Sequence, residues 1–321
     1  MVNRSLRVGV TAIAIALMFR LTAGGDKLKS FLVYLETGHH VRFSASDGDY
    51  FPGFSQSAEP VFLMLPTEPP ETQPPETIPP ETLPSYFCAP EIVNTSGKTP
   101  DTDELLDRPL RWNLYGDKTV LILHTHATES YTKHGENYKE SASWRTLDES
   151  YNMISIGARV AELLEEAGIG VIHDKTLHDY PSYNGSYAAS RETMAAILAE
   201  NPGIQLVLDL HRDAADMGWG QLRTLAQAAG KTCAQLMVVI GGGQKGYEDN
   251  LSLGLKLTAQ LERQAPGITR NLLMRSATFN QDLCPGALLI EVGAAGNSRE
   301  EALLAAEQLA EAIIALAEGT A

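Results

Sequence analysis

The chain has 321 residues, of which 44% are apolar and 20% charged. Most of it can therefore bury a core, and disorder of the chain as a whole is disfavoured. Its net charge of −15 makes it a poor ligand for polyanions and argues against general nucleic-acid binding. Only three cysteines are present, Cys88, Cys233 and Cys284, and they form no CxxC pair. A four-cysteine zinc site, an iron–sulfur cluster and a disulfide scaffold are therefore disfavoured.

Residues 1–25 combine a basic start with an apolar run. Arg4 and Arg7 precede the run at 8–19, and Arg20 ends it. The run is shorter than the roughly 20 residues that comfortably span a bilayer. It predicts a signal-anchor with a snorkelling arginine, with a cleaved signal peptide or a buried helix as alternatives. The basic flank then predicts a single-pass membrane protein whose remaining chain is extracytoplasmic.

The prolines gather in the next region, 26–111. Residues 66–84 read PTEPPETQPPETIPPETLP, a Pro-Pro-Glu-Thr repeat. Proline lacks the backbone donor that helices and sheets need, and glutamates repel one another. This segment is predicted to be an extended polyproline II stalk between the anchor and a folded domain.

Residues 112–321 show a globular pattern in which strands alternate with helices. This alternation predicts one three-layer α/β domain with a mostly parallel central sheet flanked by helices. Gly168 stands where a helix C-terminal cap is expected. The predicted strands are 119–123, 169–173, 204–210, 235–240 and 286–292, and the predicted helices are 148–167, 186–200, 251–264 and 299–318.

Polar side chains follow or interrupt three of these strands. His124 and His126 follow the first strand, His211 follows the third, and Glu291 stands within the last. Sites in open α/β sheets gather at the carboxyl ends of strands, so these side chains are predicted to converge. A fourth candidate is Glu149, whose carboxylate would suit the start of the first helix.

Two histidines and a carboxylate with an open position are typical of a catalytic zinc (Zn2+) site, and a second carboxylate can act as a general base. Each residue alone also has an ordinary explanation. A strand-end histidine can be a structural hydrogen-bonding residue, Glu149 a helix-terminal charge, and Glu291 the partner of Arg212 or Arg275. Convergence of all of them on one sheet edge is what favours the zinc site.

Several motifs in order resemble the stage II sporulation protein P family, membrane-anchored peptidoglycan hydrolases of endospore-forming bacteria. The resemblance extends over roughly 117–317. The motifs are HTHATESY at 124–131, YNGSY at 183–187, DLHRD at 209–213, FNQD at 279–282 and PGALLIEVG at 285–293. The predicted anchor and stalk also fit the layout of this family.

The family's catalytic domain is similar to zinc-dependent N-acetylmuramoyl-L-alanine amidases. This similarity implies that His126, Glu149 and His211 bind zinc and that Glu291 is the catalytic glutamate. The amidases have a glycine-rich turn around the first histidine, which this chain lacks. The choice between His126 and His124 as first ligand is therefore left open.

The resemblance further implies cleavage of the amide between N-acetylmuramic acid and L-alanine during forespore engulfment, in the septal space between membranes. Endopeptidase action on cross-links is left open. Arg212 would be a second oxyanion donor or a grip on a peptide carboxylate, against an ordinary ion pair with Asp213. Implied partners are stage II sporulation protein D and a recruiting membrane protein. The alternatives are a non-catalytic peptidoglycan-binding scaffold and a zinc carboxypeptidase-like peptidase.

Overall fold

The structure is a computed structural model that describes residues 90–133, 144–214 and 221–319. The predicted anchor (1–25) and stalk (66–84) lie outside these ranges. Among the helices within them, none is both long enough and apolar enough to cross a bilayer.

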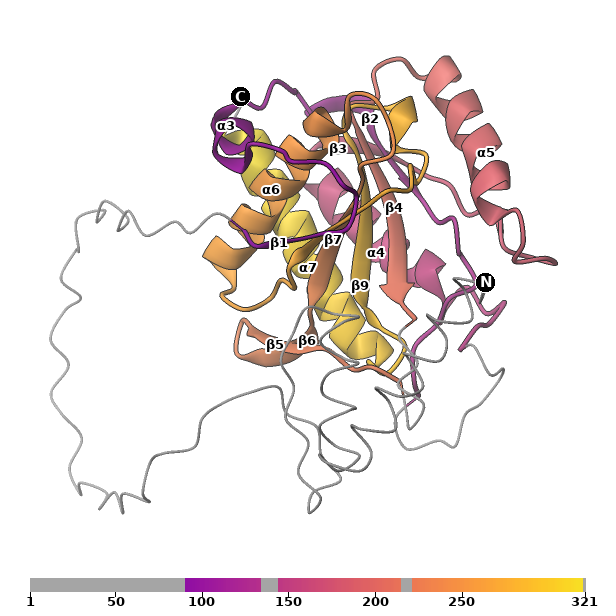
Figure 1. The fold of residues 1–321 in the computed structure, drawn as a ribbon. Helices are drawn as coiled ribbons and strands as arrows, with labels where there is room; N and C mark the ends of the chain where they lie inside the picture. Colours follow the sequence, from indigo (N-terminus) through magenta and orange to yellow (C-terminus); the bar gives the residue numbers. More distant parts are fainter. Residues whose placement is uncertain (1–89, 134–143, 215–220, 320–321) are drawn as a thin grey trace, which may run out of the picture. The chain divides into compact units, whose positions relative to one another are not determined.

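A seven-stranded sheet forms the centre of the domain (Figure 1). All neighbouring strands are parallel except β7 and β9, which confirms the prediction of a mostly parallel sheet. A separate hairpin pairs β5 (Leu225–Ala228) with β6 (Lys231–Ala234). In spatial order the central strands are β1 (Ile92–Asn94), β8 (Leu272–Arg275), β7 (Leu236–Gly241), β9 (Ala287–Ala294), β4 (Leu206–Asp213), β2 (Gly116–Leu123) and β3 (Ile169–His173).

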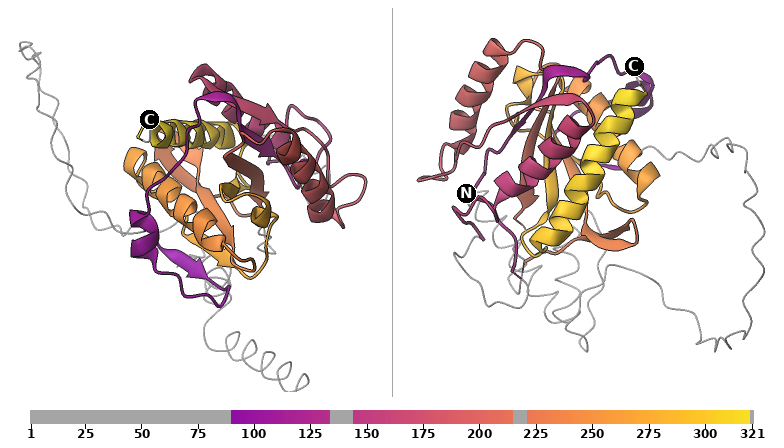
Figure 2. Two further views of the ribbon diagram at one scale, coloured as in Figure 1. Left: turned by 90° about the horizontal axis from the view of Figure 1, so that it is seen from above. Right: turned by 180° about the vertical axis from the view of Figure 1, so that it is seen from behind.

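Helices cover both faces of this sheet, so the predicted three-layer α/β architecture is confirmed. The helices α4 (Met153–Glu166), α6 (Tyr247–Gln264) and α7 (Arg299–Glu318) cover one face, and Figure 2 shows α4 and α7 side by side. The other face carries α5 (Ser186–Glu200) and the short 3-10 helix η1 (Gln281–Leu283). The remaining helix, α3 (Thr102–Asp107), packs on α6.

Strand periodicity explains the two cores. In β2, Val120 and Ile122 enter the large core beneath α4, α6 and α7, whereas Leu121 and Leu123 enter the smaller cluster that contains Met194 of α5. Successive side chains of a strand point to opposite faces, so each buried strand supplies both cores. The same alternation decides which polar side chains of β4 and β9 can meet.

Some elements differ from their predicted bounds. Helix α4 begins at Met153 rather than near 148, because the side chain of Asn152 caps it by accepting a hydrogen bond from Ile154 N at 3.0 Å. Both β1 and α3 precede residue 112, where the globular pattern was predicted to begin, and β1 pairs with β8 in the central sheet. By contrast β3, α5 and α7 have the predicted bounds.

Candidate functional site

The carboxyl ends of β4 and β9 bring His211 and Glu291 together. These two strands are parallel neighbours (Figure 1), and the two residues are partners in the register. In β4 the residues Leu206, Leu208 and Leu210 enter the large core. His211, which follows Leu210, therefore points to the opposite face, the one that carries α5. Glu291 alternates in the same way between Ile290 and Val292, and the two polar side chains therefore lie on one face.

The segment that follows β2 supplies two further side chains. Residues 124–131 are buried although most of them are polar. The ring of His126 lies 5.2 Å from the ring of His211, measured between centroids, and perpendicular to it. Glu129 is 3% exposed, and its Oε2 lies 3.7 Å from Nδ1 of His211. We refer to His126, Glu129, His211 and Glu291 as the His–Glu cluster.

Glu129, and not the predicted Glu149, lies beside His211. Glu149 is exposed in the turn before α4, and because α4 begins at Met153 it does not open the helix. The structure therefore does not bring Glu149 to the cluster, whereas Glu129 is buried beside His211. Two signals were available in the sequence: Asn152 as a helix cap, and a carboxylate three residues after His126 within the HTHATESY motif.

Arg212 is buried and contacts the segment that carries Glu129. It is 2% exposed, and its Nε and Nη2 donate to the backbone carbonyls of Ser130 and Trp144 at 3.0 and 2.9 Å. Its Nη1 lies 3.5 Å from Oε1 of Glu129. Asp213, the predicted ion-pair alternative, instead pairs with Arg270 at 2.7 Å. Arg212 thus holds Glu129 and the segment around it through buried contacts.

The structure separates the roles of His124 and His126. His124 is fully buried, with Nδ1 3.1 Å from the carbonyl of Leu210 and Nε2 3.0 Å from Nε2 of His173. Because a carbonyl only accepts, Nδ1 of His124 carries the proton and Nε2 accepts from His173. Burial lowers the pKa of His124 to about 3, with His173 adding to the effect. Both nitrogens of His124 are thus engaged away from the cluster, which favours His126 as the ligand.

Asp209 orients His211 from the side opposite Glu129. Its Oδ1 lies 3.0 Å from Nε2 of His211 and accepts from Thr125 N at 2.8 Å, while Oδ2 accepts from Thr125 Oγ1 at 2.6 Å. Burial alone would lower the pKa of His211, but Asp209, Glu129 and Glu291 together raise it to about 9. A carboxylate on Nε2 directs Nδ1 toward Glu129, as carboxylates behind metal-binding histidines do.

Burial and like charge raise the pKa of Glu291. Burial is the largest cause, Asp213 and Glu129 add to it, and the pKa reaches about 8 although His211 opposes the rise. A carboxyl group with this property is suited to accept and return a proton near neutral pH. By contrast, burial lowers the pKa of His126 to about 4, so this ring is neutral and can offer a lone pair.

The cluster suits zinc by its chemistry. Nδ1 of His126, Nε2 of His211 and Oε2 of Glu291 are buried and have no hydrogen-bond partner. The close contact of His211 Nε2 with Asp209 is therefore an ion pair rather than an aligned hydrogen bond. Two imidazoles and a carboxylate beside a second carboxylate are the donors of catalytic zinc sites. As they stand, however, the described residues contain no group of three or more His, Cys, Asp or Glu side chains arranged to hold a metal ion.

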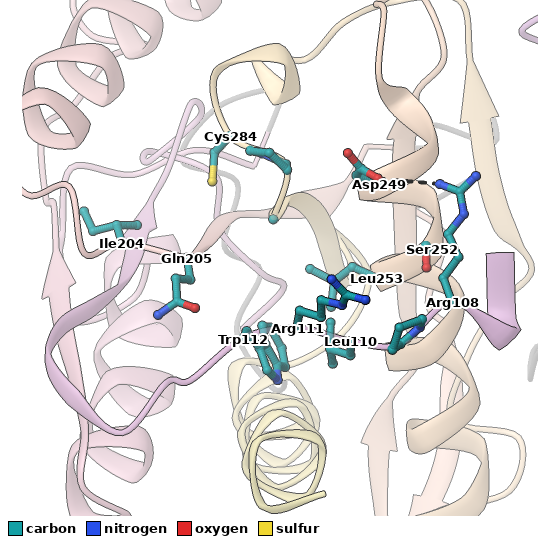
Figure 3. Close-up of a pocket in the computed structure, with 13 residues that line it drawn as sticks. Arg108, Leu110, Arg111, Trp112, Ile204, Gln205, Asp249, Ser252, Leu253 and Cys284 are labelled. Atoms are coloured by element: carbon teal, nitrogen blue, oxygen red, sulfur yellow. Dashed lines mark ion pairs between the residues drawn. The ribbon is translucent and has the colours of Figure 1, made fainter. Parts of the chain in front are cut away.

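A hollow of about 460 Å³ lies at the opposite ends of these strands, where β4 and β9 begin (Figure 3). Ile204 and Gln205 precede β4, and Cys284 and Gly286 precede β9, so the hollow adjoins the starts of the strands whose far ends carry His211 and Glu291. None of the cluster side chains lines it. Burial raises the pKa of the Cys284 thiol, as is typical of a packed thiol rather than a nucleophile.

Comparison with known proteins decides the family. The model of the stage II sporulation protein P family matches residues 90–314. The chain belongs to this family. The stage II sporulation protein P of Bacillus subtilis (strain 168) is 32% identical over 212 residues, which cover 61% of this chain and 50% of that relative. The chain thus matches about half the length of that stage II sporulation protein P, and the family resemblance read from the motifs is confirmed.

Solved structures of amidases are also similar to this chain. They include the N-acetylmuramoyl-L-alanine amidase AmiC2 of Nostoc punctiforme, with 15% identity, a TM-score of 0.38, and coverage of 63% of this chain and 99% of that one. The CwlD amidase of Clostridioides difficile, solved in complex with the GerS lipoprotein, has 15% identity, a TM-score of 0.40, and coverage of 63% and 98%. The amidase Ami1 of Mycobacterium smegmatis has 14% identity, a TM-score of 0.40, and coverage of 64% and 99%.

Proposed function

We propose that this protein is a zinc-dependent peptidoglycan hydrolase that cleaves the amide between N-acetylmuramic acid and L-alanine. The observation that carries the proposal is the His–Glu cluster. In a chain of the stage II sporulation protein P family, two histidines and two glutamates converge at the carboxyl ends of β4 and β9. Two buried polar atoms there, Nδ1 of His126 and Oε2 of Glu291, have no hydrogen-bond partner, in keeping with a site built to hold a ligand.

His126, Glu129 and His211 are the side chains that would hold the zinc ion. His126 is neutral and its Nδ1 is unpartnered, while Asp209 fixes the orientation of the His211 ring. A zinc ion bound there would polarise the scissile carbonyl and acidify a water molecule. Arg212 holds Glu129 in place through its contacts with the surrounding backbone.

Glu291 is the proposed general base and acid. Its Oε2 is unpartnered, and its pKa is raised to about 8 by burial and by Asp213 and Glu129. It would take a proton from the attacking water as the oxygen bonds to the lactoyl carbonyl carbon. It would then give this proton to the alanine nitrogen as the carbon–nitrogen bond breaks.

A Glu291→Gln variant tests this assignment. Glutamine keeps the size of the side chain but cannot take a proton, so hydrolysis of purified peptidoglycan should fall by 10²-fold or more. Zinc content should remain stoichiometric, because Glu291 is not a proposed ligand. Undiminished hydrolysis by the zinc-loaded variant would refute the role of Glu291. Mass spectrometry of the muropeptides distinguishes an amidase, which frees lactoyl groups, from a carboxypeptidase-like peptidase, and a scaffold would release nothing.

Glu129 and Glu149 form a matched pair for the zinc site. Glu129→Gln should abolish tight zinc binding, measured by elemental analysis after dialysis, because a ligand is lost. Glu149→Gln makes the same chemical change on an exposed turn and should leave zinc content and hydrolysis unchanged. The opposite result, loss of zinc with Glu149→Gln alone, would restore the assignment made from sequence spacing.

The cellular setting of this activity is likewise a proposal. The apolar segment at 8–19 and the Pro-Pro-Glu-Thr repeat at 66–84, predicted to form a stalk, support a membrane-anchored enzyme whose catalytic domain acts outside the cytoplasm during engulfment. We propose stage II sporulation protein D and a recruiting membrane protein as partners, on the basis of family membership. Fractionation of sporulating cells, with and without residues 1–25, tests the anchor: the truncated protein should leave the membrane fraction.

A further inference from the structure

An exposed tyrosine stacks on one ring of the His–Glu cluster. Tyr183 belongs to the loop 174–185 between β3 and α5, and its side chain is 55% exposed. Its ring nevertheless stacks on the ring of His126, with centroids 4.5 Å apart and planes 20° apart. An aromatic ring that remains half in water is not placed by core packing, so a specific contact must hold it there.

Arg145 provides this contact. Its guanidinium carbon lies 4.5 Å from the centroid of the Tyr183 ring, within the range of a cation–π interaction. The same guanidinium forms an ion pair with Asp179, and its Nη2 lies 3.4 Å from Oε1 of Glu129. Arg145 is thus fixed by buried carboxylates on one side and contacts the tyrosine on the other.

Asp179 connects this arrangement to the segment that carries both proposed ligands. It is 6% exposed and accepts hydrogen bonds from Thr128 N at 3.2 Å and from Thr128 Oγ1 at 2.6 Å. Thr128 lies between His126 and Glu129 in the chain. The loop 174–185 therefore supplies an anchor for the ligand segment through Asp179 and a ring against His126 through Tyr183.

The other aromatic neighbours of His126 do not stack on its ring. Tyr187 and His211 both meet this ring edge-on, at 85° and 90°. Nδ1 of His126 has no hydrogen-bond partner, whereas Oδ1 of Asp209 lies 3.0 Å from Nε2 of His211. Among these ring contacts, the stack with Tyr183 is the one that lies parallel to the imidazole and opposes its tilting.

We infer that Tyr183 is a positioning residue for the first zinc ligand: Arg145 holds its ring against His126, and the stack fixes the imidazole plane in the absence of a hydrogen-bonding partner on that ring. This inference rests on the proposed function, since it assigns a task to Tyr183 only if His126 binds zinc. Tyr183 replaces, by stacking, the carboxylate or carbonyl that commonly orients a metal-bound histidine.

The test is the zinc affinity of the purified full chain, measured by competition with a chromophoric chelator. Tyr183→Ala should weaken zinc binding by 10-fold or more, the range seen when an orienting partner of a ligand is lost. Tyr183→Phe keeps the ring and should stay within about 2-fold of the wild type, because stacking does not need the hydroxyl. Arg145→Lys keeps the charge but loses the planar guanidinium, and should weaken binding as well.

Tyr180→Ala is the matched control. Tyr180 belongs to the same loop and is also 55% exposed, but it has no ring contact with the cluster among those of the described residues. Its loss should leave the affinity for zinc unchanged, and the urea midpoint of each variant shows whether the fold is retained. If Tyr183→Ala does not fold, Tyr183→Leu, which keeps bulk without an aromatic face, takes its place.

The outcomes distinguish this inference from the proposed function. A wild-type protein that binds no zinc overturns both. A wild-type protein that binds zinc, with equal affinity in Tyr183→Ala, overturns the positioning role and leaves the proposed function intact. A variant with unchanged zinc affinity but a raised KM for peptidoglycan makes Tyr183 a substrate contact and likewise overturns the inference.

Discussion

Gly157 offers a sharp test of the packing behind the site, because two effects of one substitution have opposite signs. It lies within α4, where alanine is favoured over glycine by up to about 1 kcal/mol. A Cβ atom at this position, however, would lie 2.6 Å from Nε2 of both His124 and His173. This is about 0.8 Å closer than ordinary van der Waals contact.

The two rings have little freedom to move away. His124 is fully buried, and its nitrogens are engaged by the carbonyl of Leu210 and by His173. Overpacking of this kind costs about 1–3 kcal/mol, and a broken buried hydrogen bond adds about 0.5–1.5 kcal/mol. After about 1 kcal/mol of helix propensity is subtracted, Gly157→Ala should destabilise the protein by roughly 0.5–3.5 kcal/mol.

Urea unfolding of the purified protein, followed by circular dichroism, measures this effect. Gly319→Ala is the control, because Gly319 has right-handed helical backbone angles at the end of α7 and its added Cβ would have ordinary contacts of 3.5 and 3.7 Å. The control should change the free energy of unfolding by less than about 0.5 kcal/mol. If Gly157→Ala raised stability by the amount expected from helix propensity, the argument that the histidine pair requires a glycine would be refuted.

Three further predictions concern other parts of the domain. Asp209→Asn should reduce both zinc affinity and hydrolysis by about 10–100-fold, because the charge that orients His211 is lost; activity equal to the wild type would contradict this role. Burial raises the pKa of Glu301, but hydrogen bonds from Arg223, Asn297 and the backbone of Ser298 outweigh this effect and lower the pKa below its usual 4.5. Glu301 therefore stabilises the fold above pH 4.5 and loses this contribution as the pH falls through its pKa in the folded protein. Glu301→Gln should cost about 1–2 kcal/mol at pH 7 and progressively less in acid. A difference in urea unfolding that does not depend on pH would be inconsistent with this account. In a Cys88→Ser variant the remaining thiols should resist labelling at about pH 8 until urea is added. The reason is that burial raises the pKa of Cys233 to about 11 and also raises that of Cys284. Rapid labelling of the folded protein would contradict this prediction.

Several features of the domain could be predicted because they depend on local patterns. The predicted bounds of α5 and α7 were confirmed, since local signals mark them: Asn201-Pro202 follows α5, and the capping box of Ser298 and Glu301 begins α7. The sheet was predictable from its continuous apolar strands, such as β2. The short strands β1 and β8 carried too little periodicity to be recognised.

What the sequence by itself determined was the α/β class, the family and the convergence of His211 and Glu291, which stand near the ends of two strong strands. What only the tertiary structure decided was the choice among neighbours in irregular segments. Glu129 rather than Glu149 reaches His211, His126 rather than His124 has a free nitrogen, and Arg212 is buried beneath Glu129. The physical reason is that strand register fixes where a side chain points, whereas the path of a loop is set by distant hydrogen bonds, such as those from Arg212 to the carbonyls of Ser130 and Trp144, which no local pattern encodes.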